Sequence, residues 1–197
     1  MNDLFRACKH GKAVAVKRLV IENSYTPEEF SMAAELAGTH KAIVKYLFEY
    51  CPEAVCSEAT LVNAINKHIF EIDIDFVKLL ISHGGRVSFS VLLTAALREH
   101  NKLVSELLRF QKWSVGDLSK AFEYAAMNNS IELMEELRGA GAVPGAQALN
   151  NAICTNHYYV VVYLLDLGLR PTFEDFVAVK DERIERALAR AGTDAKL

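Results

Sequence analysis

One short pattern recurs along this chain and constrains the fold more than any other feature. Each copy has an alanine-containing apolar stretch, a polar break, and then an apolar pair followed by leucine. The clearest copies run over Ala95–Leu108, Ala125–Leu137 and Ala152–Leu165, with looser ones over Glu35–Leu47 and Ala64–Leu80. A fixed internal period indicates a repeat architecture, in which each unit is one small supersecondary element.

The leucine near the end of each copy gives the period. These leucines are Leu19, Leu47, Leu80, Leu107, Leu137 and Leu164, at spacings of 28, 33, 27, 30 and 27 residues. Four of the six copies have Asn or Gly four residues later, at Asn23, Gly84, Gly141 and Gly168. Because both residue types tolerate the left-handed conformation, we expect them to end helices there.

Each copy predicts two short helices. Alanine in the first stretch lets a neighbouring backbone come close, and the second stretch has apolar residues at helical spacing, as in Ile43, Val44 and Leu47. No segment alternates apolar and polar residues for long enough to predict a strand.

Helix-start signals separate the copies. Thr26-Pro27-Glu28-Glu29 reads as a capping box with proline at the first helical position. Ser114 with Asp117, and Thr172 with Asp175, follow the same logic more weakly.

A pair of short helices cannot bury its own apolar stripe, so such pairs must stack. We therefore predict an all-α fold, an α-solenoid of about six degenerate helix-turn-helix repeats with a C-terminal capping unit. The chain is expected to be a single repeat domain over 1–197, with units at about 1–25, 26–56, 57–87, 88–114, 115–144 and 145–171, and a cap at 172–192.

From about Asp3 to Gly192 the chain resembles the ankyrin repeat, a turn and two helices with a period of about 33 residues. The shared features are the alanine-rich first helix, the polar break that often ends in histidine, the V-x-x-L second helix and the closing glycine. Tetratricopeptide and HEAT-type arrays fit the period and the single Trp113 less well.

Two departures from the ankyrin pattern change the expected structure. The stretches between copies are too short for projecting β-hairpin fingers, so we expect plain turns. The third copy carries an insertion at Ile69–Ile72, which we expect to lengthen its first helix by a turn.

Composition narrows the class of partner. The net charge is −3, which disfavours binding by phosphate neutralisation, and no apolar run is long enough to span a bilayer. The four cysteines include no CxxC pair, so we expect free thiols in a reducing compartment and an intracellular protein without a signal peptide. We expect no cofactor and no metal.

Candidate catalytic groups have a simpler structural explanation. His40, His100 and His157 occupy the same place in three copies, just before the second helix, and the ankyrin resemblance implies that this histidine braces the turn. Glu132, Glu135 and Glu136 are expected on a solvated helix face. Neither a G-x-S-x-G motif nor a phosphate-binding loop is present, so the sequence predicts no enzyme.

The resemblance implies that the exposed last turn of each first helix lines a concave partner-binding face. The matching positions here are Lys9, His10, Asn66, Lys67, Leu97, Arg98, Met127, Asn128, Cys154 and Thr155. In the second copy Ala37 and Gly38 leave a shallow spot. Aromatic residues such as Tyr158, Tyr159, Phe110, Trp113 and Phe70 are a second set of candidate anchors, with burial in the core as the alternative.

The sequence thus predicts a non-enzymatic module that binds a partner protein. The alternative is a regulator, an inhibitor, or an effector that a microbe or virus directs at a host factor. We expect a monomer that binds neither nucleic acid nor membrane. Its expected location is the cytoplasm or nucleus, with delivery into a host cell left open.

Overall fold

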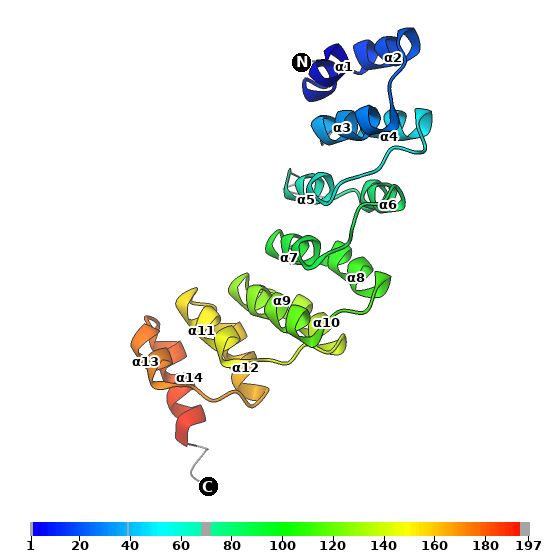
Figure 1. The fold of residues 1–197 in the computed structure, drawn as a ribbon. Helices are drawn as coiled ribbons and strands as arrows, with labels where there is room; N and C mark the ends of the chain where they lie inside the picture. The colour runs from blue at the N-terminus through cyan, green and yellow to red at the C-terminus, as the bar shows by residue number, and fades with distance from the viewer. Residues whose placement is uncertain (1, 39, 68–71, 194–197) are drawn as a thin grey trace. The chain divides into compact units, whose positions relative to one another are not determined.

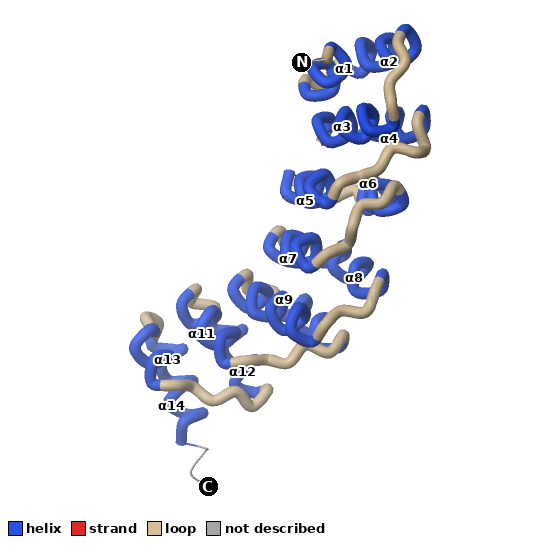
Figure 2. Tube along the Cα trace, viewed as in Figure 1, coloured by secondary structure: helices blue, strands red, loops and turns tan. Residues whose placement is uncertain are grey.

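The computed structural model describes residues 2–38, 40–67 and 72–193. Within these ranges the chain forms fourteen helices and no strand, and short loops join the helices (Figures 1 and 2). The predicted all-α class and the plain turns are therefore confirmed. No helix of the described part is both long enough and apolar enough to cross a membrane.

The chain divides into two compact units, Met1–Thr94 and Ala95–Leu197. The first contains α1 (Asp3–Lys9), α2 (Ala13–Glu22), α3 (Pro27–Ala37), α4 (Lys41–Tyr50), α5 (Glu58–Lys67) and α6 (Ile74–Ser82). The second contains α8 (Asn101–Phe110), α9 (Val115–Met127), α10 (Ile131–Gly139), α11 (Ala146–Cys154), α12 (Tyr158–Asp166), α13 (Phe173–Ala178) and α14 (Glu182–Thr193). Helix α7 (Phe89–Leu97) begins in the first unit and ends in the second.

Both units repeat one packing scheme. A first helix packs against the second helix of its own pair, as α1 does on α2 and α9 on α10. First helices also pack on the first helices of adjacent pairs, as α1 does on α3 and α9 on α11. Second helices stack in the same way, α2 on α4 and α12 on α14, so each unit is a solenoid of helix pairs.

The core follows the repeated leucines with one exception. Leu47, Leu80, Leu107, Leu137 and Leu164 are buried. Leu19 is only half-buried, and Val16 and Val20 supply the buried face of α2 instead. The repeated leucine position is therefore not part of the core in α2.

The helix-start predictions are confirmed. Thr26 Oγ1 accepts a hydrogen bond from the Glu29 amide while the Thr26 amide donates to the Glu29 carboxylate. Thr172 and Asp175 form the same reciprocal pair at α13, and Ser114 caps α9 through the Asp117 amide. Each pair satisfies amide groups that the first turn leaves without a partner.

The helix-end prediction is right for the glycines and wrong for Asn23. Gly84, Gly141 and Gly168 have φ of 88°, 112° and 93°. Asn23 has an extended backbone with φ −131°, and its side-chain Nδ2 donates to the Leu19 carbonyl at 3.0 Å. The side-chain amide and the backbone amide of Asn23 both donate to the Leu19 carbonyl, and α2 ends there without a left-handed residue.

A second set of left-handed residues lies in the short turn between the first and the second helix of four pairs, which we call the pair break. The sequence pattern did not indicate these residues. Gly11, Glu99, Asn129 and Asn156 have φ between 57° and 67°. In all four of these breaks the next amide donates to an alanine carbonyl of the first helix, for example His100 N to Ala95 O at 3.0 Å. The amide of the left-handed residue also donates to a carbonyl of the first helix, as Glu99 N does to Ala96 O at 3.1 Å. These two hydrogen bonds fix the turn between the two helices.

The insertion of the third copy lies mostly outside the described residues, at 69–71. Ile72 is half-buried and precedes Asp73, which caps α6 and forms an ion pair with Lys41. The expected extra turn of the first helix stays a prediction.

Candidate partner-binding surface

Six of the expected binding positions lie in the second unit, where the first helices of three consecutive pairs end. They are Leu97 and Arg98 at α7, Met127 and Asn128 at α9, and Cys154 and Thr155 at α11. We call these six residues the first-helix-end surface. Hydrogen bonds hold the three ends side by side: Asn128 Nδ2 donates to the Leu97 carbonyl at 3.2 Å, and His157 Nε2 donates to the Met127 carbonyl at 2.9 Å.

The six side chains differ in what they offer to a partner. Leu97 is 40% exposed, and Arg98, Cys154 and Thr155 are also exposed, whereas Met127 and Asn128 are half-buried. The Asn128 amide and the Thr155 hydroxyl donate to backbone carbonyls, the latter to Asn151 at 2.7 Å. The surface thus joins an apolar residue to polar groups whose positions are fixed by the backbone.

The other expected positions lie in the first unit. Lys9 and His10 are exposed at the end of α1, and Asn66 is half-buried near the end of α5. The Lys67 side chain lies outside the described residues. Ala37 and Gly38 are buried at the end of α3, where the sequence predicted a shallow spot.

The three repeated histidines each directly precede a second helix, as the sequence pattern indicates. His157 donates across to the preceding pair, while His40 lies so close to Gly11 that a Cβ added there would be 2.6 Å from the imidazole. His100 is 7% exposed, and its Nε2 has no hydrogen-bond partner among the described residues. His83, which the repeat pattern did not indicate, stacks on Phe48 with ring centroids 4.2 Å apart.

The buried thiols of Cys8 and Cys56 are not activated as nucleophiles. Burial raises the pKa of Cys8 to about 12, and burial together with the Glu35 carboxylate does the same for Cys56. A nucleophilic cysteine needs a lowered pKa, so neither thiol is activated. Among the described residues no group of three or more His, Cys, Asp or Glu side chains could hold a metal ion.

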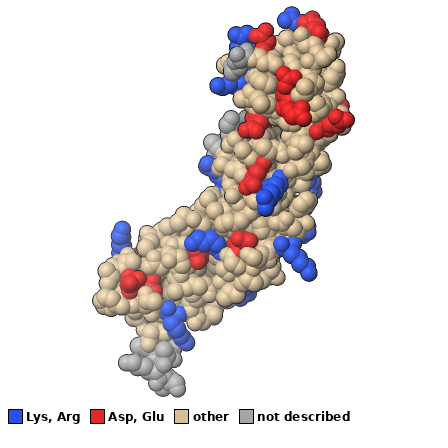
Figure 3. All heavy atoms as spheres, viewed as in Figure 1, with Lys and Arg blue, Asp and Glu red and all other residues tan. Residues whose placement is uncertain are grey.

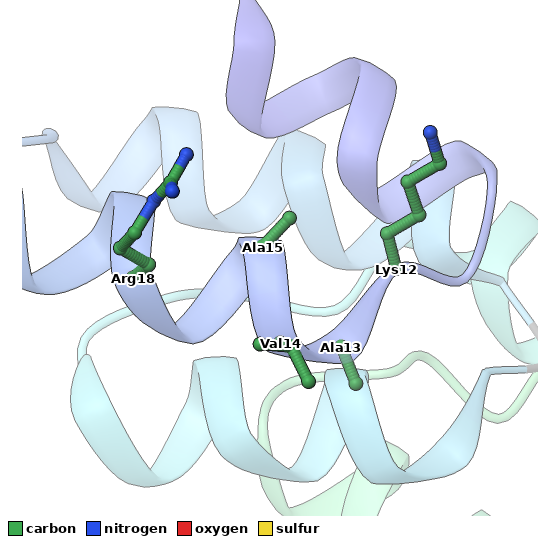
Figure 4. A pocket seen from close by; sticks show the side chains of 5 residues that line it. All are labelled: Lys12, Ala13, Val14, Ala15 and Arg18. Carbon is green, nitrogen blue, oxygen red and sulfur yellow. The ribbon is translucent and has the colours of Figure 1, made fainter.

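The hollows of the described surface are shallow. One of about 430 Å³ lies on α2, where Lys12 and Arg18 project on either side of Ala15 (Figure 4). Another, of about 420 Å³, lies beside the pair breaks of the second unit, and one of about 270 Å³ lies between α12 and α14. In the view of Figure 3, acidic and basic side chains are scattered over an otherwise uncharged surface, and several of opposite charge lie next to one another.

Comparison with known proteins gives a structural match. No protein-family model matches the chain, and no curated protein does. Its structure is similar to a crystal structure of the human ASB11 ankyrin repeat domain, with a TM-score of 0.67 and 18% sequence identity. The similarity covers 97% of this chain and 98% of that one. Together with the stacked helix pairs, this match shows that the chain has the ankyrin-repeat fold.

Proposed function

We propose that the chain is a non-enzymatic protein-binding module and that the first-helix-end surface takes part in binding. The observation that carries the proposal is the alignment of three first-helix ends by the Asn128 and His157 hydrogen bonds. The core positions of these pairs hold similar apolar residues, whereas the six surface residues differ in kind from pair to pair. Such a contrast suits a common scaffold with a specialised face.

The physical advantage of this surface is that it is formed before the partner arrives. Its backbone is fixed by helix-end hydrogen bonds, so binding orders few groups and loses little conformational entropy. Leu97 supplies an exposed apolar side chain and Arg98 an exposed charged one, and protein interfaces combine apolar and charged side chains. We expect the module to act as a monomer inside the cell, and the four positions of the first unit (Lys9, His10, Asn66 and Lys67) to extend the contact.

The test is affinity capture from lysate with quantitative mass spectrometry of the retained proteins. The surface variant is Leu97→Glu with Cys154→Glu, which places two carboxylates at the ends of α7 and α11. The control variant is Val115→Glu with Ala140→Glu, which adds the same charge at two exposed positions, the start of α9 and the end of α10.

A protein held by the wild type and the control but lost by the surface variant is the expected result. The circular dichroism melting curves of all three proteins must agree for this result to count. Equal retention by both variants would contradict the proposed surface, and no retained protein at all would contradict the proposed class of function.

A further inference from the structure

The groove beside the pair breaks of the second unit combines residues from three consecutive helix pairs. Its volume is about 420 Å³. It is lined by Glu99, Asn128, Asn129, Ser130, Ile131, Glu132 and Tyr159. Asn128 also belongs to the first-helix-end surface. The groove and that surface therefore share a residue, and one partner could contact both.

The chemistry of the groove is anionic and aromatic. Glu99 and Glu132 are exposed carboxylates, and neither forms an ion pair within the described residues. Tyr159 is 72% exposed, an unusual degree for an aromatic residue on a helix whose other face is core. None of the described residues that line the groove is basic.

A cation is the ligand that both features favour. Carboxylates attract it by Coulomb forces, and the face of a tyrosine ring attracts it through its quadrupole. The adjacent Tyr158 already shows this contact inside the molecule, because the Arg183 guanidinium lies 5.3 Å from its ring centroid. Arg183 forms an ion pair with Asp181, with Nη2 to Oδ2 at 2.7 Å, and it is not among the residues that line the groove.

The backbone at Glu99 gives a further reason to look for a role beyond stability. At the same left-handed position the other breaks use Gly11, Asn129 and Asn156, the residue types that this conformation favours. Glutamate is not among the residue types that this conformation favours, and Glu99 is one of the residues that line the groove.

We propose that this groove receives an arginine or lysine side chain of the partner protein. The inference rests on the proposed protein-binding function and adds to it the chemistry of one partner residue. Glu99 and Glu132 neutralise the incoming cation, and Tyr159 covers its apolar stem and one face of the charged head.

The test uses random 12-residue peptides displayed on phage and selected on the intact chain. Enriched peptides are synthesised, and their affinity is measured by fluorescence anisotropy against the Leu97→Glu, Cys154→Glu surface variant and three further variants. Glu99→Gln with Glu132→Gln removes the two groove charges, Tyr159→Ala removes the ring, and Glu135→Gln with Glu185→Gln removes two exposed charges outside the groove. Each synthetic peptide is also made with citrulline, the uncharged analogue of arginine, or with norleucine in place of lysine.

The expected result is a set of peptides that share an arginine or lysine. Their affinity should fall about tenfold or more for the two groove variants and for the uncharged peptide, and stay within about twofold for the Glu135/Glu185 control. Thermal melts that match the wild type exclude unfolding as the cause.

The outcomes that overturn the inference are separate from those that overturn the proposed function. Peptides that depend on Leu97 and Cys154 but bind the groove variants normally would contradict the cation site and leave the binding module standing. Groove-dependent peptides without a basic residue would contradict the proposed chemistry. A selection that enriches nothing would contradict both proposals.

Discussion

The imidazole of His157 donates through Nε2 to the carbonyl oxygen of Met127, 2.9 Å away and thirty positions earlier in the chain. A carbonyl oxygen only accepts, so Nε2 must carry the proton. Asn128 makes the corresponding contact with Leu97 one pair earlier, at 3.2 Å. The end of a first helix is thus capped by a side chain of the following pair, which ties neighbouring pairs together through polar groups as well as through the core.

Replacing His157 with alanine should weaken this tie. The bond is partly buried, so we expect the free energy of unfolding to fall by about 0.5–1.5 kcal/mol. His10→Ala, at an exposed imidazole, is the control and should change stability by less than about 0.5 kcal/mol. Urea unfolding measures both, and equal effects would show that the Met127 contact contributes nothing.

The repeated leucine should matter in proportion to its burial. Leu107 is 1% exposed, and Leu107→Ala should cost about 2–5 kcal/mol through lost burial and the cavity left behind. Leu19→Ala, at the half-buried equivalent in α2, should cost less than half as much. Chemical denaturation of the two variants under the same conditions tests the difference, and a larger loss at Leu19 would refute the assignment of the core.

Two glycines only two residues apart should respond to alanine in opposite directions. Gly141 has φ 112°, so alanine is strained there although its nearest contact, Leu118 Cδ1, would be 3.8 Å away; we expect a loss of about 1–2 kcal/mol. Gly139 is the last residue of α10 with open space around it, and alanine there should add about 0.5–1 kcal/mol. Melting temperatures that move the same way would contradict this reading.

The buried thiols make stability depend on alkaline pH. Burial raises the pKa of Cys8 and Cys56 from 9.0 to about 12, so the folded chain keeps protons that the unfolded chain releases. Their contribution is therefore complete below pH 9 and is lost progressively as the pH rises from 9 towards 12.

A comparison with the Cys8→Ala, Cys56→Ala protein isolates this effect, because that variant keeps every other group that titrates in the alkaline range. The double variant should be less stable at pH 7, because alanine buries less side-chain volume than cysteine. Its stability should decline less steeply between pH 9 and pH 11 than that of the wild type. Parallel declines would show that the two thiols are not the source.

Local sequence signals predicted much of the fold. The leucine period places the second helices, and the capping boxes at Thr26 and Thr172 form because all their partners lie within four residues. Contacts between pairs were not predictable in this way. Ser31 Oγ accepts from the Val55 amide at 2.8 Å and Ser119 Oγ from the Val143 amide at 2.9 Å, a repeated brace whose partners are 24 residues apart.

In the candidate surface, too, local features could be predicted from the sequence and contacts between pairs could not. The family resemblance located the first-helix ends, but it could not show that the Asn128 amide is used to hold Leu97 in place. The groove draws Glu99, Glu132 and Tyr159 from different pairs, and no local pattern joins them. The sequence did contain one signal for the groove. Lys102, Glu132 and Tyr159 are each the second residue of a second helix, and the residue type at this position changes from pair to pair.

The most direct test of the account is hydrogen–deuterium exchange on the intact chain, with and without the captured partner. Bound partner should slow amide exchange at 95–99, 125–132 and 152–159, where the first helices end and the groove lies, and leave the second-helix ends at 107–111 and 136–140 unchanged. Protection confined to those second-helix ends would contradict both the proposed surface and the role given to its fixed hydrogen bonds.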